Sequence, residues 1–135
     1  MAGPVHVLVA DDEPHIGRII KMKLEQGLFR VTLAFDGRQA VETLEHEPDI
    51  KLLLLDLMMP HMSGLDVLQK IRADERWKDL PCVILTAAGQ EADHRRAIEL
   101  GATDFLTKPF SPKKLYARCA ELVGASDEEA EAESA

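Results

Sequence analysis

The stretch KLLLLDLMMP, residues 51–60, constrains the fold more than any other part of this chain. Four consecutive leucines without alternation are typical of a strand covered on both faces, and such strands occur in parallel sheets. The run then reaches Asp56, so a carboxylate ends the most hydrophobic strand of the chain. The stretch therefore predicts a buried central strand with a charged group at its end, and that group requires an explanation.

The rest of the chain alternates between short apolar runs and segments with helical periodicity. Pro14 suits the first turn of the helix after the first run, and Gly101 suits the end of the helix after the fourth. We expect strands at Val5–Ala10, Arg30–Phe35, Lys51–Asp56, Cys82–Ala87 and Asp104–Lys108. Strands that alternate with helices in this way predict an α/β fold with a five-stranded parallel sheet and five helices.

Composition favours one domain without a membrane span. The chain has 135 residues, of which 46% are hydrophobic, which is enough for a single sizeable core. No apolar run is long enough to cross a bilayer, and the N-terminus lacks the charged region of a signal peptide. Cys82 and Cys119 each lie in an apolar pattern, as buried free thiols do in a reducing compartment. We therefore expect a cytoplasmic protein.

Charge is distributed unevenly along the chain. The formal net charge is -8, and the last eleven residues contain acidic side chains but no basic ones. Such a segment cannot bury apolar area, so we expect a folded domain at residues 1–124 and a disordered acidic tail at residues 125–135. Lys and Arg are not concentrated on one face, so the sequence gives no indication of a nucleic-acid partner.

Polar side chains occur where the predicted strands end. They are Asp11, Asp12 and Glu13 after the first strand, Asp56 at the third, Thr86 at the fourth and Lys108 at the fifth. Open parallel sheets bind ligands outside the carboxyl ends of their strands, where the strand order reverses. If the first strand neighbours the third, the three aspartates meet at that edge, with Thr86 and Lys108 beside them.

Clustered carboxylates need a compensating cation. Two unit charges about 4 Å apart repel by about 4 kcal/mol at an effective dielectric constant of 20. Mg²⁺ fits because it accepts one or two carboxylates, keeps waters and favours phosphate as a further ligand. Asp56 would then be a candidate nucleophile for phosphoryl transfer, with Lys108 and the metal stabilising the transferred group and Thr86 supplying a hydroxyl.

Each of these residues has an ordinary structural explanation when it is taken alone. Asp11 or Asp12 alone is more often the N-cap of a helix, and Lys108 alone is a solvated lysine. Their joint placement at the strand ends favours the functional interpretation. The five histidines are scattered without paired metal-ligand spacing, and we expect Trp77 to be a partly exposed loop anchor.

Four stretches of this chain resemble the receiver domain of bacterial two-component response regulators. They are VLVADDEP, LLLLDLMMPHMSGLDVL, VILTA and GATDFLTKPFS, and the resemblance extends from about Val5 to Val123. Within this family, the chain resembles the stand-alone regulators of the chemotaxis type. The resemblance implies a doubly wound (βα)5 flavodoxin-like fold with the strand order 2-1-3-4-5.

The resemblance also implies a role for each site residue. Asp56 would accept a phosphoryl group from the phosphohistidine of a histidine kinase, and Lys108 would bind the phosphoryl oxygens. Mg²⁺ would be held by Asp12, Asp56 and the Met58 carbonyl, with Asp11 acting through water. Thr86 and Phe105 would form the switch. The Lys108–Pro109 peptide would be cis, which about 5–6% of X–Pro bonds are.

We therefore interpret the chain as a single-domain response regulator, not an enzyme beyond its own phosphorylation and dephosphorylation. Phosphorylation would change an interaction surface on the fourth helix, fifth strand and fifth helix of a monomer or weak dimer. Its partners would be a histidine kinase and either a downstream protein or, in a phosphorelay, a histidine phosphotransfer protein. The chain also fits an isolated receiver cut from a longer regulator.

Three other classes fit less well. A phosphatase that forms an aspartyl phosphate needs two aspartates separated by one residue after the first strand, whereas Asp11 and Asp12 are adjacent. A receiver-shaped scaffold that is not phosphorylated would normally lack one key residue, and all are present. A nucleotide-binding domain would carry a glycine-rich phosphate loop after the first strand, and none follows it.

Overall fold

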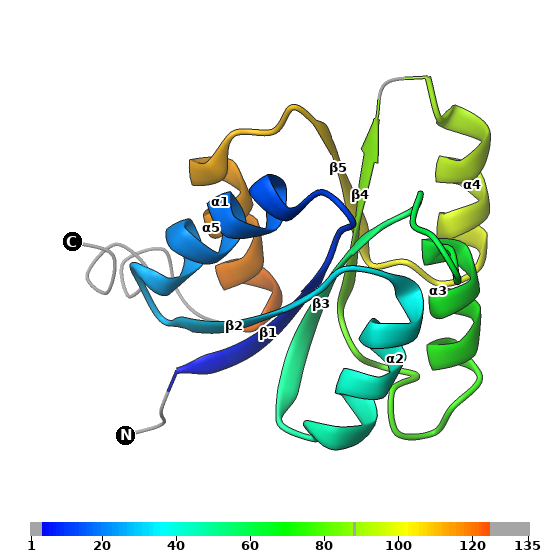
Figure 1. Cartoon of the computed structure of the whole chain (residues 1–135), viewed down its shortest axis with the longest axis horizontal. Helices are drawn as coiled ribbons and strands as arrows, with labels where there is room; N and C mark the ends of the chain where they lie inside the picture. The colour runs from blue at the N-terminus through cyan, green and yellow to red at the C-terminus, as the bar shows by residue number, and fades with distance from the viewer. Residues whose placement is uncertain (1–3, 88, 125–135) are drawn as a thin grey trace.

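A single parallel sheet with the strand order β2-β1-β3-β4-β5 organises the molecule, as expected (Figure 1). The computed structural model describes residues 4–87 and 89–124. The strands are β1 (Val5–Ala10), β2 (Phe29–Ala34), β3 (Ile50–Asp56), β4 (Cys82–Ala87) and β5 (Asp104–Lys108). Strand order reverses between β1 and β3, so the carboxyl ends of these two strands border one crevice.

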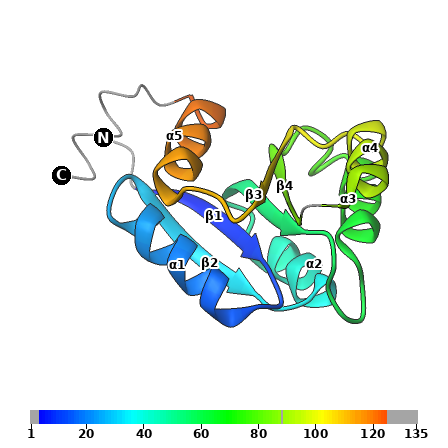
Figure 2. The ribbon, with the colours of Figure 1, turned by 90° about the horizontal axis from the view of Figure 1, so that it is seen from above.

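Helices cover both faces of the sheet. Helices α1 (Pro14–Glu25) and α5 (Pro112–Leu122) lie on one face (Figure 2). The opposite face carries α2 (Gly37–His46), α3 (Gly64–Arg72) and α4 (Glu91–Glu99) (Figure 1). Helix ends follow local chemistry: Ser63 caps the start of α3 through a capping box with Asp66, and Gly101 adopts a positive φ of 102° just after α4 ends.

The leucine run is explained by these two layers. Leu53 and Leu55 belong to the core under α2, α3 and α4, whereas Leu52 and Leu54 belong to the core under α1 and α5. All four side chains are fully buried. Within this leucine run strand β3 therefore has no polar face, and Asp56 is its last residue, at the carboxyl edge of the sheet.

Two details differ from the expectations. Strand β2 begins and ends one residue earlier than predicted, at Phe29–Ala34, because the side chain of Phe29 joins the core beside Tyr116 in an edge-on contact. Trp77 was expected to be a partly exposed anchor, but it is only 8% exposed and packs in the core under α2 and α3. The acidic tail and Ala88 lie outside the described residues, and the described helices include none that could span a membrane.

Gly64 should be needed for the position of Asp56. A Cβ atom at Gly64 would lie 2.2 Å from the carbonyl oxygen of Asp56, and the Gly64 N–H donates to the carbonyl of Leu57. We expect Gly64→Ala to lower the free energy of unfolding by about 1–3 kcal/mol, because the backbone must shift. Urea unfolding measures this loss.

Gly17→Ala is the matched control. A Cβ atom at Gly17 would meet only the side chain of Leu33, at 3.3 Å, and alanine favours the helix by about 1 kcal/mol. This variant should be close to neutral. Equal destabilisation of the two variants would contradict the claim that backbone contact with the end of β3 sets the requirement.

Candidate functional site

Lys108 at the end of β5 connects the carboxylates at the ends of β1 and β3. Its Nζ lies 2.8 Å from Asp11 Oδ2, 3.6 Å from Asp56 Oδ2 and 3.4 Å from Glu13 Oε1. The lysine side chain is 17% exposed, and the side chains of Asp11 and Asp56 are 0% and 8% exposed. The ammonium group is therefore held in a partly dehydrated position, where its charge is poorly screened.

The three predicted aspartates meet at this edge. Oxygen atoms of Asp11, Asp12 and Asp56 lie within 4.8 Å of one another, with Asp12 exposed and the other two buried. The Asp11 carboxylate accepts the Glu13 N–H at 2.9 Å, and the Asp56 carboxylate accepts the Met58 N–H at 3.3 Å. An oxygen-only cluster with one exposed member fits a hard divalent cation that keeps several waters.

Charge and burial change the acidity of Asp56. Burial, followed by the negative charge of Asp11, raises its pKa from 3.8 to about 7, against the opposing effects of Lys108 and the Met58 N–H. Burial alone would lower the pKa of Lys108, but its contacts with Asp11, Asp56 and Glu13 raise it. Without a further cation, Asp56 is therefore partly protonated near neutral pH while Lys108 stays charged.

The two expected switch residues lie on neighbouring strands. Thr86 is buried in β4, where it pairs in register with Thr107 of β5. Phe105 in β5 is 39% exposed, and its ring contacts the ring of His94 in α4 with 3.5 Å between centroids. The structure thus places Thr86 at the acidic edge and Phe105 on the outer surface between β5 and α4.

A small hollow of about 270 Å³ opens at the acidic edge. Its lining consists of Asp12, Glu13, Asp56, Met58, Ala87, Gln90 and Lys108. Asp11 and Thr86 are buried and do not belong to this lining. The Met58 side chain is 63% exposed, whereas Met59 and Met62 pack against the core under α2, α3 and α4. The Lys108–Pro109 peptide is cis, as the resemblance implied.

Sequence reasoning gave no role to two of these lining residues. Glu13 contacts Lys108. Gln90 lies beyond the end of β4, and its side chain turns back to the strand, where its Oε1 accepts the Ala87 N–H at 2.6 Å. Glu13 directly follows the acidic pair, and that adjacency was an available signal. Gln90 follows β4 by three residues, and no spacing rule predicts that its side chain folds back to the strand end.

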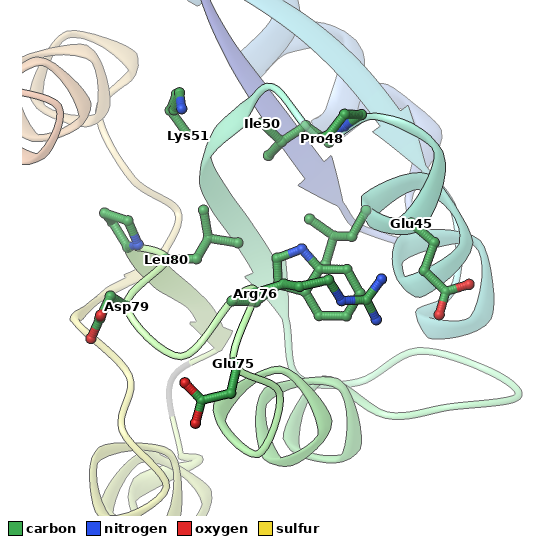
Figure 3. A pocket seen from close by; sticks show the side chains of 11 residues that line it. Glu45, Pro48, Ile50, Lys51, Glu75, Arg76, Asp79 and Leu80 are labelled. Carbon is green, nitrogen blue, oxygen red and sulfur yellow. The ribbon is translucent and has the colours of Figure 1, made fainter.

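A second hollow, of about 400 Å³, lies at the opposite edge of the sheet, between α2 and the loop before β4 (Figure 3). The Arg76 guanidinium lies 4.0 Å from the centroid of the Trp77 ring and is held by Asp74. Figure 3 shows Glu45, Glu75 and Asp79 around this hollow. It contains none of the site residues that the sequence predicts, all of which lie near the carboxyl ends of the strands.

Comparisons with known protein sequences all lead to one family. A sequence model of the response regulator receiver domain matches residues 7–120. The phosphate regulon transcriptional regulatory protein PhoB of Escherichia coli is 43% identical over 112 residues, which are 83% of this chain and 48% of that protein. The DNA-binding dual master transcriptional regulator RpaA of Synechocystis is 38% identical over 122 residues, covering 90% and 50%. The chain spans about half the length of these curated relatives.

Solved structures of response regulators have the same fold as this chain. The receiver domain of the Francisella response regulator 1452 is 34% identical, with a TM-score of 0.78 over 87% of this chain and 95% of that one. The chemotaxis response regulator CheY4 of Vibrio cholerae is 26% identical, with a TM-score of 0.82 over 88% and 98%. The likeness to both proteins extends over nearly their whole chains.

The raised pKa of Asp56 predicts a pH-dependent stability difference. A carboxyl group whose pKa rises from 3.8 in the unfolded chain to about 7 in the folded protein favours folding when it is protonated. Its contribution to stability is present at low pH and is lost as the pH rises to about 7. In Mg²⁺-free buffer, Asp56→Asn should therefore gain stability relative to wild type between about pH 5 and pH 8, on the order of 2 kcal/mol.

Chemical denaturation across this pH range measures the difference. Asp66→Asn, which removes an exposed carboxylate of the capping box, is the control for the loss of an aspartate charge. Parallel stability curves for Asp56→Asn and wild type would contradict the assignment of the raised pKa to Asp56.

Proposed function

The chain belongs to the response regulator receiver domain family, and we propose that it accepts a phosphoryl group on Asp56 from the phosphohistidine of a histidine kinase. One observation carries the proposal. A buried carboxylate at the end of β3 lies 3.6 Å from a partly buried ammonium group and beside two further aspartates at the strand-order reversal. This arrangement supplies a nucleophile, a fixed positive charge and ligands for a cation.

In the proposed reaction, an oxygen of the Asp56 carboxylate attacks the phosphorus atom of phosphohistidine. A phosphorus–oxygen bond forms, the phosphorus–nitrogen bond breaks, and the imidazole leaves with the electron pair and takes up a proton. Lys108 stabilises the negative charge of the transferred oxygens because it remains protonated. The Met58 N–H, which donates to the Asp56 carboxylate, holds the nucleophile in place.

The acidic cluster would hold Mg²⁺ through Asp12, Asp56 and the Met58 carbonyl, with Asp11 acting through water. The donor set fits, because it consists of oxygens and its carboxylates repel one another without a cation. When bound, Mg²⁺ neutralises charge on the phosphoryl group and keeps Asp56 ionised at neutral pH. The chain's own part is to place the carboxylates, hold Asp56 in one orientation and supply Lys108.

A kinase must cover surface next to Asp56 to deliver its phosphohistidine. An apolar hollow of about 210 Å³ adjoins the site and shares Lys108 as a lining residue. Its other lining residues are Ile16, Ile19, Pro109, Phe110 and Pro112. Ile19 on α1 is 45% exposed, so this face offers an apolar contact beside the reacting atoms. The hollow supports docking of the kinase, or of a phosphotransfer protein, over α1 and the segment after β5.

The proposed output is a change on the surface of α4, β5 and α5. Phosphorylation draws the Thr86 hydroxyl toward the phosphoryl oxygens, and Phe105 moves inward from its exposed contact with His94. The signal then passes to a cytoplasmic protein partner, or the phosphoryl group passes to a histidine phosphotransfer protein.

Because this chain spans about half of PhoB and RpaA, an isolated receiver of a longer transcriptional regulator is the second candidate. A DNA-binding domain encoded in the same reading frame would distinguish the two forms.

Phosphorylation of Asp56 can be measured directly. Incubation with Mg²⁺ and a small acyl-phosphate donor should add one phosphoryl group, detected by intact mass. The adduct should be absent in Asp56→Asn and without Mg²⁺, and Asp12→Asn should form it at least tenfold more slowly, since a metal ligand is lost. Asp36→Asn, at the exposed cap of α2, is the matched control and should react like wild type. An undiminished adduct in Asp56→Asn would refute the assignment.

Thr86 should couple the phosphoryl group to Phe105. A change from 1:99 to 99:1 between two states requires about 5.5 kcal/mol of differential interaction. One hydroxyl bond to a charged oxygen supplies about 1.5–3 kcal/mol, so Thr86→Ala should accept the phosphoryl group but respond only partly. NMR shifts of α4 and β5 after phosphorylation measure the response, with Thr107→Ala on the adjacent strand as the control. Full-size shifts in Thr86→Ala would rule out this coupling.

A further inference from the structure

The amino-terminal edge of the sheet carries a second group of potential metal ligands, far from Asp56. Ligand atoms of His6, Glu47 and Asp49 lie within 4.8 Å of one another. His6 is the second residue of β1, and the two acidic residues lie in the connection between α2 and β3. Asp11 follows the other end of β1, and the five residue steps from His6 to Asp11 separate the two groups by about 16 Å. This group is therefore separate from the phosphoryl site.

The His6 ring is buried and fixed at both nitrogens. Its residue is 1% exposed, Nε2 lies 2.7 Å from the Thr32 hydroxyl, and Nδ1 lies 3.0 Å from Asp49 Oδ1. A proton on Nδ1 lets the ring donate to Asp49 and accept from the Thr32 hydroxyl. When the Nε2–H donates to Thr32 instead, the lone pair of the neutral ring is at Nδ1, and a metal ion can take the place of the proton between Nδ1 and the Asp49 carboxylate. Histidines that bind metals are oriented by such a contact on the far nitrogen.

Asp49 is oriented in the same way. Its Oδ2 accepts the Arg30 guanidinium at 2.5 Å, which leaves Oδ1 directed at His6. Arg30 pairs in register with His6, so β2 supplies the outer contacts for both ligands, through Arg30 and Thr32. The charge of Arg30 offsets one carboxylate, and Glu47 leaves the group with a net negative charge. The group thus has fixed ligand atoms and an electrostatic preference for a cation.

We propose that His6 Nδ1, Glu47 and Asp49 bind a divalent transition metal ion of the Zn²⁺ class. Zinc–nitrogen and zinc–oxygen distances of about 2.0–2.2 Å place tetrahedral ligand atoms about 3.4 Å apart. The His6 and Asp49 atoms are already 3.0 Å apart, and the partly exposed Glu47 side chain is free of the sheet and can close on the ion by rotation. Water fills the fourth position. The imidazole favours Zn²⁺ over Mg²⁺, so each end of β1 selects a different metal.

A bound ion would connect the start of β1 to the loop before β3. Pro48 and Ile50, the chain neighbours of Asp49, line the hollow shown in Figure 3. An ion at this loop therefore fixes one wall of that hollow. Because the ligands come together only in the folded chain, the ion stabilises the fold by mass action.

The test is calorimetric titration of the full chain with ZnCl₂ in excess Mg²⁺, so that the acidic cluster near Asp56 is saturated with magnesium. One Zn²⁺ per chain should bind, and the Nδ1 resonance of His6 in ¹⁵N-labelled protein should shift. Glu47→Gln and Asp49→Asn should each weaken binding at least tenfold. Glu45→Gln and His46→Gln, which change neighbouring side chains of the same segment, should bind as tightly as wild type.

Glu47→Gln keeps the test valid if Asp49→Asn disturbs folding, because it preserves side-chain size and leaves the His6–Asp49–Arg30 contacts in place. Absent binding, binding that is unchanged in Glu47→Gln, loss of binding in His46→Gln or an unshifted His6 resonance would each overturn the proposal. Weakened binding in Glu47→Gln together with a shifted His6 resonance would establish it.

Discussion

The fold brings several carboxylates together at the end of β3, and the rest of the structure has to offset the repulsion among them. Asp56 and Asp11 are both buried, and Asp12 lies close enough to share one ion with them. Burial, followed by the charge of Asp11, raises the pKa of Asp56, and Lys108 offsets only part of this effect. A cluster of this kind persists because the leucines of β3 are fully buried on both faces of the sheet, so the strand end cannot relax away from its neighbours.

Side chains of β5 alternate between the side of the proposed phosphoryl site and the side of the proposed output surface. Lys108 and Leu106 point to one side of the strand, whereas Phe105 and Thr107 are more exposed on the other. Leu106 packs against the core under α1 and α5, and Phe105 contacts His94 on α4. A movement of β5 at the acidic edge would therefore reach the opposite surface through this one strand, which is paired with β4. This arrangement gives the proposed switch a physical path only a few residues long.

The sequence predicted the elements and the strand-end residues because both depend on local pattern. Unbroken leucines indicate a two-sided strand, and parallel strands place their carboxyl ends at one edge, so Asp11, Asp12, Asp56 and Lys108 could be grouped before any coordinates. Trp77 could not be placed, because its burial depends on how the loop before β4 packs under α2. The His6 group was missed for the same reason: its ligands are more than forty residues apart and meet only through strand register.

Competition for Lys108 explains how one added group could reorganise this edge. In the unphosphorylated protein, Lys108 Nζ is closer to Asp11, at 2.8 Å, than to Asp56, at 3.6 Å. A phosphoryl group replaces the single charge of the Asp56 carboxylate with a charge of about −2 and extends toward the hollow. Lys108 would then be drawn from Asp11 and Glu13 to the new oxygens, and β5 would move with it because the lysine side chain is partly buried and has little room to move alone. The same displacement would leave Asp11 without its cation unless a metal ion were bound. Metal binding and the movement of β5 would therefore depend on each other, because a bound cation would balance the charge of Asp11 that Lys108 leaves behind.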